Sequence, residues 1–187
     1  MVDQVTFDIG GGVSAGLSAV QVVAGLLTGA RSVTVEVDNN TDLTLILGHR
    51  HHDHGGWGPT IPDPKIGPYQ PDPKGCTNVF SSQNKGGSIM TGTEGWVSYN
   101  GHKAKQSNLG PPIVRFTVKW NNPYLSLPWN DGNSGGAWLT MLDGSKVTPY
   151  KVRYVIGVGN TQAAFRFMFF PASQISGPLI QDVTDWT

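Results

Sequence analysis

The sequence predicts a mainly β protein: an antiparallel β-sandwich with an N-terminal amphipathic α-helix packed on it. Three observations favour this fold class. The 187 residues include 25 glycines and 13 prolines but only 14% charged residues, a balance typical of short strands joined by turns. Several segments alternate apolar and polar residues, whereas one uncharged N-terminal segment has helical spacing instead. A chain of this length can bury its own core, so we expect one domain over residues 1–187.

The predicted helix covers residues 10–30. No charged residue occurs from residue 9 to residue 30, and small or polar residues form a stripe parallel to the apolar one. The part from Val13 to Leu27 would be about 22 Å long as a helix, close to one bilayer core if extended by a turn. A core helix packed on a sheet is the alternative, because periodicity does not separate the two. The face expected to insert into a membrane comprises Val13, Leu17, Val20, Val23, Ala24, Leu26 and Leu27.

Alternation predicts strands from residue 32 onward. Residues 32–38 place three valines on one face, and Asn39-Asn40-Thr41 forms a turn before a second strand at residues 43–47. Glycine and asparagine separate most of the later strand candidates, which favours an antiparallel sandwich. These candidates are residues 77–82, 95–100, 112–120, 137–142, 152–158 and 163–170.

Residues 48–75 predict a long His- and Pro-rich surface loop. Proline lacks the N–H that a central strand donates, and Pro-Asp-Pro-Lys occurs twice, at residues 62–65 and 71–74. Residues 171–187 carry little pattern and are expected to form a C-terminal arm. Both segments are expected to belong to the single predicted domain.

Four histidines occur within six residues of the predicted loop. Alternate side chains of an extended chain share a side, so a pair of these imidazoles can chelate a divalent metal. Spacing alone does not make a closed site, and a solvated polar loop is the alternative. No other cofactor is expected. The candidate metal ligands are His49, His51, His52 and His54.

The segment Asp131-Gly-Asn-Ser-Gly-Gly-Ala137 is similar to the nucleophile loop of trypsin-like and HtrA-type serine proteases. Such a loop exposes the serine and supplies an oxyanion hole from backbone N–H groups. A triad also needs an upstream histidine in a suitable context, and the chain is too short for a helix and two six-stranded barrels. We therefore expect no enzyme, with a protease using Ser134 as a third alternative.

Aromatic residues and prolines, with almost no charge, follow one predicted strand in the segment Trp120-Asn-Asn-Pro-Tyr124-Leu-Ser-Leu-Pro-Trp129. Indole and phenol rings combine an apolar body with a polar tip, which is typical of an anchor at a membrane surface. Carbohydrate or choline recognition would use the same residues. A loop that covers the core is the structural alternative. The net charge is zero, so the chain lacks the basic surface typical of nucleic-acid binding, and we expect no nucleic-acid partner.

In this order the segments resemble the actinoporins, pore-forming cytolysins of sea anemones with relatives outside anemones. A helix leads into Ser32-Val-Thr-Val-Glu-Val-Asp-Asn39, which is similar to the family's first strand and its Asn turn. Residues 78–95 resemble its Lys-x-x-Gly-Pro-Val-Ala-Thr-Gly stretch. Val114-Arg-Phe-Thr-Val118 stands where the family has Leu-Phe-Ser-Val-Pro. The resemblance covers roughly residues 10–140.

The resemblance implies a secreted haemolytic toxin that stays soluble until it binds a membrane, oligomerises there and inserts its N-terminal helix. Thr117 stands at the family's headgroup serine, and Trp120, Tyr124 and Trp129 stand at membrane-facing aromatic positions. The implied partner is a phosphocholine lipid. Lys119 replaces a family proline, so another headgroup or a glycan stays open. A lectin-like or lipid-headgroup-binding module without pore formation is the alternative function.

Overall fold

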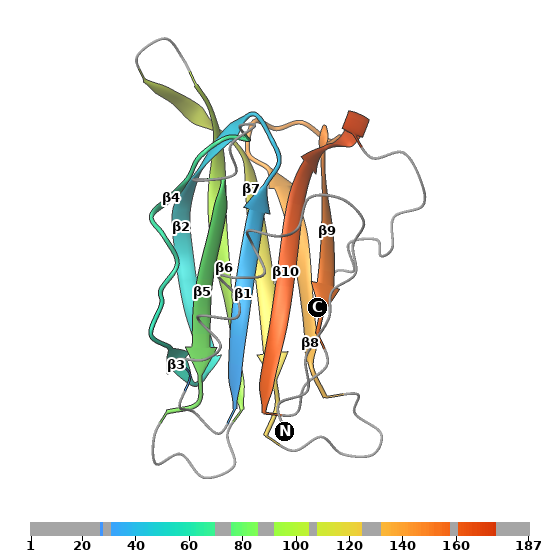
Figure 1. Cartoon of the computed structure of the whole chain (residues 1–187). Helices are drawn as coiled ribbons and strands as arrows, with labels where there is room; N and C mark the ends of the chain where they lie inside the picture. The colour runs from blue at the N-terminus through green and yellow to red at the C-terminus, as the bar shows by residue number, and fades with distance from the viewer. Residues whose placement is uncertain are drawn as a thin grey trace.

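In the described part of the chain, ten strands form two five-stranded sheets that pack face to face (Figure 1). The computed structural model describes residues 27, 31–69, 76–85, 92–104, 108–124, 132–157 and 161–174. Within these residues the chain is mainly β, with one short 3-10 helix, η1 (Ala172–Gln174). The predicted β-sandwich is therefore confirmed.

The two sheets take strands from the whole length of the chain, and the first six strands alternate between them. Sheet A has the order β3-β5-β1-β10-β9 and sheet B the order β4-β2-β6-β7-β8. Sheet A consists of β1 (Ser32–Asn39), β3 (Gly56–Trp57), β5 (Thr77–Gln83), β9 (Tyr150–Ile156) and β10 (Gln162–Pro171). Sheet B consists of β2 (Leu43–His54), β4 (Lys65–Ile66), β6 (Thr93–Ala104), β7 (Leu109–Asn122) and β8 (Ser134–Met141).

The core lies between the two sheets and follows the alternation of the sequence. Val33, Val35 and Val37 of β1 are fully buried, and alternate apolar residues of β7 and β10 meet them from both sheets. Burying a side chain such as Phe116 contributes about 1.5–3 kcal/mol to stability. Because the apolar positions point inward, the polar positions between them form the two outer faces of the sandwich.

Sheet A is mixed, which corrects the expectation of purely antiparallel pairing. β1 pairs parallel with β10, from Ser32 opposite Gln162 to Asn39 opposite Phe169. All other paired strands are antiparallel within the described residues. The last strand enters the middle of the sheet beside the first one, so the two run in the same direction. Alternation gives the faces of a strand but carries no information about its direction.

The prediction of a surface loop over residues 48–75 is wrong for its first part. β2 continues for 12 residues, and pairs with β6 as far as His54 opposite Glu94. A register shift between Leu47 and His49 marks an irregularity at Gly48. The described residues of the Pro-rich part contain two short strands, β3 and β4, which lie at sheet edges, where proline is tolerated. Residues 70–75 lie outside the described residues.

Most of the predicted N-terminal helix lies outside the described residues. Leu27 is described and is buried, with 9% of its surface exposed. The described part of the chain contains no helix of the length and apolarity needed to span a membrane. At the other end, the first residues of the predicted C-terminal arm belong to β10, which ends at Pro171, and to η1 (Ala172–Gln174). Residues 175–187 lie outside the described residues.

Candidate functional site

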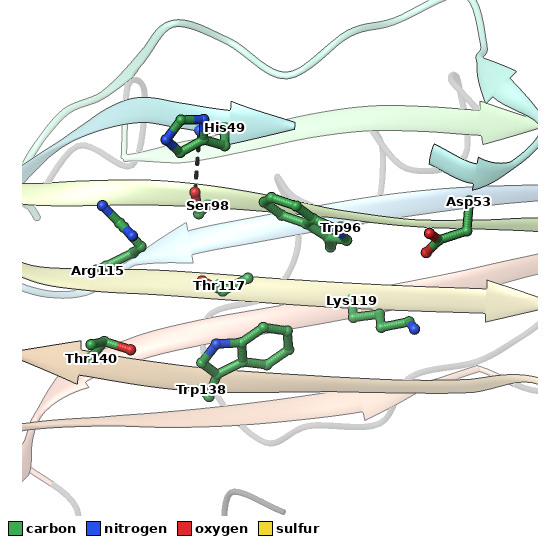
Figure 2. A pocket seen from close by; sticks show the side chains of 9 residues that line it. All are labelled: His49, Asp53, Trp96, Ser98, Arg115, Thr117, Lys119, Trp138 and Thr140. Atoms are coloured by element: carbon green, nitrogen blue, oxygen red, sulfur yellow. Dashed lines mark hydrogen bonds between the residues drawn. The ribbon is translucent and has the colours of Figure 1, made fainter. Parts of the chain in front are cut away.

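The outer face of sheet B carries a groove of about 470 Å³ (Figure 2). It crosses β2, β6, β7 and β8, whose inward-facing neighbours are core residues, so the lining side chains point outward. We call it the sheet B groove. Its lining residues are His49, Asp53, Trp96, Ser98, Arg115, Thr117, Lys119, Trp138 and Thr140.

The register of the strands shows which residues lie side by side in the middle of the groove. Ser98 of β6 lies opposite Thr117 of β7, and Thr117 in turn lies opposite Trp138 of β8. On the other side, His49 of β2 lies opposite Ser98, whose Oγ accepts a hydrogen bond of 3.2 Å from the His49 backbone N–H. Residues of four strands that are distant in the chain thus form one row across the sheet.

Two hydroxyl groups form the floor of this row. Thr117 is 4% exposed and Ser98 is 1% exposed, although both belong to the outer face. Among the described residues, no hydrogen bond engages the Thr117 hydroxyl. The predicted headgroup residue Thr117 therefore lies in the groove, where its hydroxyl group can bind a ligand; that it does so stays a prediction.

Two half-buried tryptophans flank the floor. Trp138 lies beside Thr117 on β8, and Trp96 lies on β6, one row further along (Figure 2). His51, opposite Trp96 on β2, has its ring 6.0 Å from the Trp96 ring. Sequence reasoning did not select either tryptophan. For each of them the sequence contained one signal: a tryptophan at a position of the strand where the alternation predicts an outward-facing polar residue.

The charged side chains of the groove differ in how they are paired. Lys119 forms an ion pair of 2.7 Å with Glu94, and Asp53 lies 3.3 Å from the His51 ring nitrogen. Arg115 donates from Nε to Asn100 Oδ1 at 3.1 Å. In the described part of the chain, no carboxylate pairs with Arg115. The groove thus combines aromatic faces, hydroxyl groups and one uncompensated guanidinium.

The opposite outer face, that of sheet A, carries one guanidinium that bridges two carboxylates. Arg166 of β10 bridges Glu36 at 3.1 Å and Asp38 at 2.7 Å, both on β1. Burial and the nearby Asp38 carboxylate raise the pKa of Glu36 to about 7, although Arg166 acts in the other direction. This cluster uses its charges internally, so we assign it a structural role.

The four candidate metal ligands do not converge. His49 and His51 lie on the outer face of β2, whereas His52 points to the opposite side. His52 bonds Ser82 through its Nε2 at 2.8 Å, with the Trp57 ring 4.2 Å away. Burial and positively charged neighbours lower the pKa of His52 to about 4, so the imidazole is neutral near pH 7. Among the described residues, no group of three His, Cys, Asp or Glu side chains can hold a metal, His54 included.

The aromatic segment is not one exposed loop, which corrects the role expected for Trp120. Trp120 belongs to β7 and is fully buried, with the Phe80 ring 5.5 Å away. It has no exposed surface with which to contact a headgroup. Tyr124 is half-buried, and its ring lies 5.7 Å from the Arg31 guanidinium. Trp129 lies outside the described residues.

The protease alternative gains no support from the position of Ser134. This residue begins β8, opposite Asn121 of β7. Where the structure describes the chain, no hydrogen bond joins Ser134 to a histidine. The described strands form one sandwich of two sheets rather than two six-stranded barrels.

Comparisons with known proteins find similarity in structure and not in sequence. No protein-family model and no curated protein sequence matches the chain. The chain is similar to the crystal structure of the lipid binding protein Nakanori, with 18% identity, a TM-score of 0.56, and 83% of this chain and 78% of that chain covered. IP-1A from Alcaligenes faecalis matches with 16% identity, a TM-score of 0.40, and 79% and 96% covered. The likeness to Nakanori shows that the two chains share a β-sandwich fold.

Proposed function

We propose that this protein binds membrane lipids and that the sheet B groove holds the lipid headgroup. The observation that carries the proposal is the row of Thr117 and Ser98 hydroxyls flanked by Trp96 and Trp138 on an outer sheet face. A fold shared with a protein described as lipid binding supports the same conclusion.

The chemistry of the groove suits a small polar headgroup. Its volume of about 470 Å³ lies within the range of small-molecule sites. Indole rings prefer the boundary between headgroups and acyl chains, so Trp96 and Trp138 can pack against the glycerol or sphingoid region. The Thr117 hydroxyl and the Arg115 guanidinium supply donors to headgroup oxygens.

The finer part of the proposal is pore formation. After binding, copies of the protein oligomerise on the membrane and insert residues 10–30, as the resemblance to actinoporins implies. An uncharged segment with an apolar face from Val13 to Leu27 supports this step. We also propose that the protein is secreted and stays soluble until it reaches a target membrane.

A lectin-like module without pore formation is the second candidate. It is favoured by one observation: an outward-facing indole such as Trp138, beside hydroxyl groups and Arg115, also suits a sugar ring. Vesicles that contain no glycolipid separate the two candidates. Binding and leakage on such vesicles would support the lipid proposal, and binding only after a glycolipid is added would support the lectin-like module.

Substitution of Trp138 tests the proposed site. Trp138→Ala should weaken binding to vesicles by at least about tenfold, because a partly desolvated indole at the centre of a contact contributes strongly. Trp138→Phe should retain most of the binding. Tyr69→Ala removes an exposed aromatic ring (57% exposed) outside the groove and should leave binding unchanged.

Co-sedimentation with vesicles gives the affinities, and thermal melting confirms that each variant folds. Equal binding by wild type and a folded Trp138→Ala variant would exclude the groove as the lipid site.

A further inference from the structure

A hydrogen bond orients the Arg115 guanidinium in the sheet B groove. Arg115 Nε donates to Asn100 Oδ1 at 3.1 Å, across the β6–β7 pair in which the two residues lie opposite each other. This bond leaves both terminal nitrogens of Arg115 available to a ligand. Arginine binds phosphate and carboxylate through two parallel hydrogen bonds, and a fixed guanidinium loses less entropy when it does so.

Threonines flank Arg115 at two neighbouring outward-facing positions of sheet B. Thr140 is directly opposite Arg115 on β8, and Thr117 is the next outward-facing residue along β7. Both line the groove. Hydroxyl donors around a guanidinium suit an anion with several oxygens, such as a phosphate.

Among the described residues, no carboxylate lies near Arg115 to pair with a headgroup cation. Among the lining residues the carboxylate is that of Asp53, whose Oδ1 lies 3.3 Å from His51 Nε2. From the register and the spacing of residues and strands, Asp53 is roughly 20 Å from Arg115. A choline or ethanolamine group bonded to a phosphate on Arg115 cannot reach that far. Its charge could contact the indole faces of Trp96 and Trp138, but the positive charge of Arg115 repels it.

We infer that the sheet B groove selects a lipid with a net anionic headgroup, whose phosphate is bound by Arg115 together with Thr117 and Thr140. The inference rests on the proposed function and names the class of lipid that this site takes. Selection arises locally, since the protein as a whole has no net charge.

The test measures binding to phosphatidylcholine vesicles with and without phosphatidic acid. Wild type should bind the vesicles that contain phosphatidic acid at least about tenfold more tightly. Arg115→Gln should lose roughly ten- to hundredfold on these vesicles, the range expected for hydrogen bonds to a charged group. Arg115→Lys keeps the charge but loses the bidentate hydrogen bonding, so its affinity should lie between those of wild type and Arg115→Gln. Lys146→Gln, an exposed charge in the β8–β9 loop, is the matched control and should change binding less than twofold.

The outcomes separate this inference from the proposed function. Equal losses for Arg115→Gln and Lys146→Gln would overturn the inference, because attraction would then depend on overall charge. Equally tight binding to pure phosphatidylcholine, sensitive to Trp138→Ala but not to Arg115→Gln, would overturn it while leaving the groove as the lipid site. Binding of glycerol 3-phosphate in solution without any vesicle binding would leave the phosphate subsite but refute the lipid function.

Discussion

Trp120 and Trp138 show how the same side chain takes two roles in neighbouring strands. Trp120 points into the core and is fully buried, whereas Trp138 lies on the outer face of sheet B beside Thr117. The sequence segment after residue 120 is rich in aromatic residues, and this composition favoured Trp120 as a membrane anchor. Its place in the alternation of β7, in phase with Val114, Phe116 and Val118, assigns it to the core instead.

Trp120→Ala should therefore destabilise the fold by about 3–5 kcal/mol, the usual cost of removing a large buried aromatic side chain. Vesicle binding per folded molecule should stay close to wild type. Urea unfolding followed by circular dichroism measures the first quantity, and co-sedimentation of the folded fraction measures the second. A stable Trp120→Ala protein that no longer binds vesicles would show instead that Trp120 contacts the lipid.

Only some of the groove residues could be predicted from the sequence. Thr117 was selected through the resemblance to actinoporins, and the structure places it on the groove floor. Trp96 and Trp138 were missed because their strands are distant in the chain, and only the order β2-β6-β7-β8 brings them to one site. His49 was selected for a different role, as a metal ligand, and it lines the groove instead.

At the scale of elements, the eight strands predicted from alternation are confirmed as β1, β2, β5, β6, β7, β8, β9 and β10. In β1, β7 and β10 the inward-facing valines and aromatic residues give a clear alternation. β2 was predicted too short because its apolar alternation ends at Leu47, while backbone pairing with β6 continues through the histidines. The short edge strands β3 and β4 carry too few residues for a pattern to be visible.

The N-terminal segment has one described contact point with the sandwich. A Cβ atom added at Gly58 would lie 3.1 Å from Leu27 Cδ2, so Leu27 packs where the glycine leaves room. Gly58 is bonded to β5 through its N–H and the Ser81 carbonyl at 2.9 Å. Leu27 therefore lies beside sheet A, whereas the groove opens on sheet B.

Val20→Asp tests whether the segment inserts. A carboxylate near the middle of a bilayer costs about 2.5–3.5 kcal/mol on insertion scales. The variant should bind vesicles as wild type does but release little or no trapped dye. Val20→Ile keeps the apolar face and should leave leakage unchanged. Wild-type leakage from Val20→Asp would remove the segment from the mechanism, and no leakage from wild type on any lipid mixture would favour a module without pore formation.

For the whole molecule, the two outer faces of the sandwich predict a preferred orientation on a membrane. The face of sheet A holds the closed cluster of Glu36, Asp38 and Arg166. The face of sheet B holds the groove with its two tryptophans and with Arg115, which no described carboxylate pairs. If the groove binds the headgroup, sheet B must face the lipid surface, and sheet A must face away from it.

The most direct measurement of this claim is quenching of a fluorophore by headgroup-labelled lipid. Two positions are compared in a Cys76→Ala background: Ser134→Cys on β8, which lies on the outer face of sheet B but does not line the groove, and Lys151→Cys on β9, on the outer face of sheet A. On bound vesicles, nitroxide in the headgroup region should quench the fluorophore at position 134 strongly and the one at position 151 weakly. Strong quenching at position 151 with little at position 134, while the protein remains bound, would contradict the assignment of the lipid site to the sheet B groove.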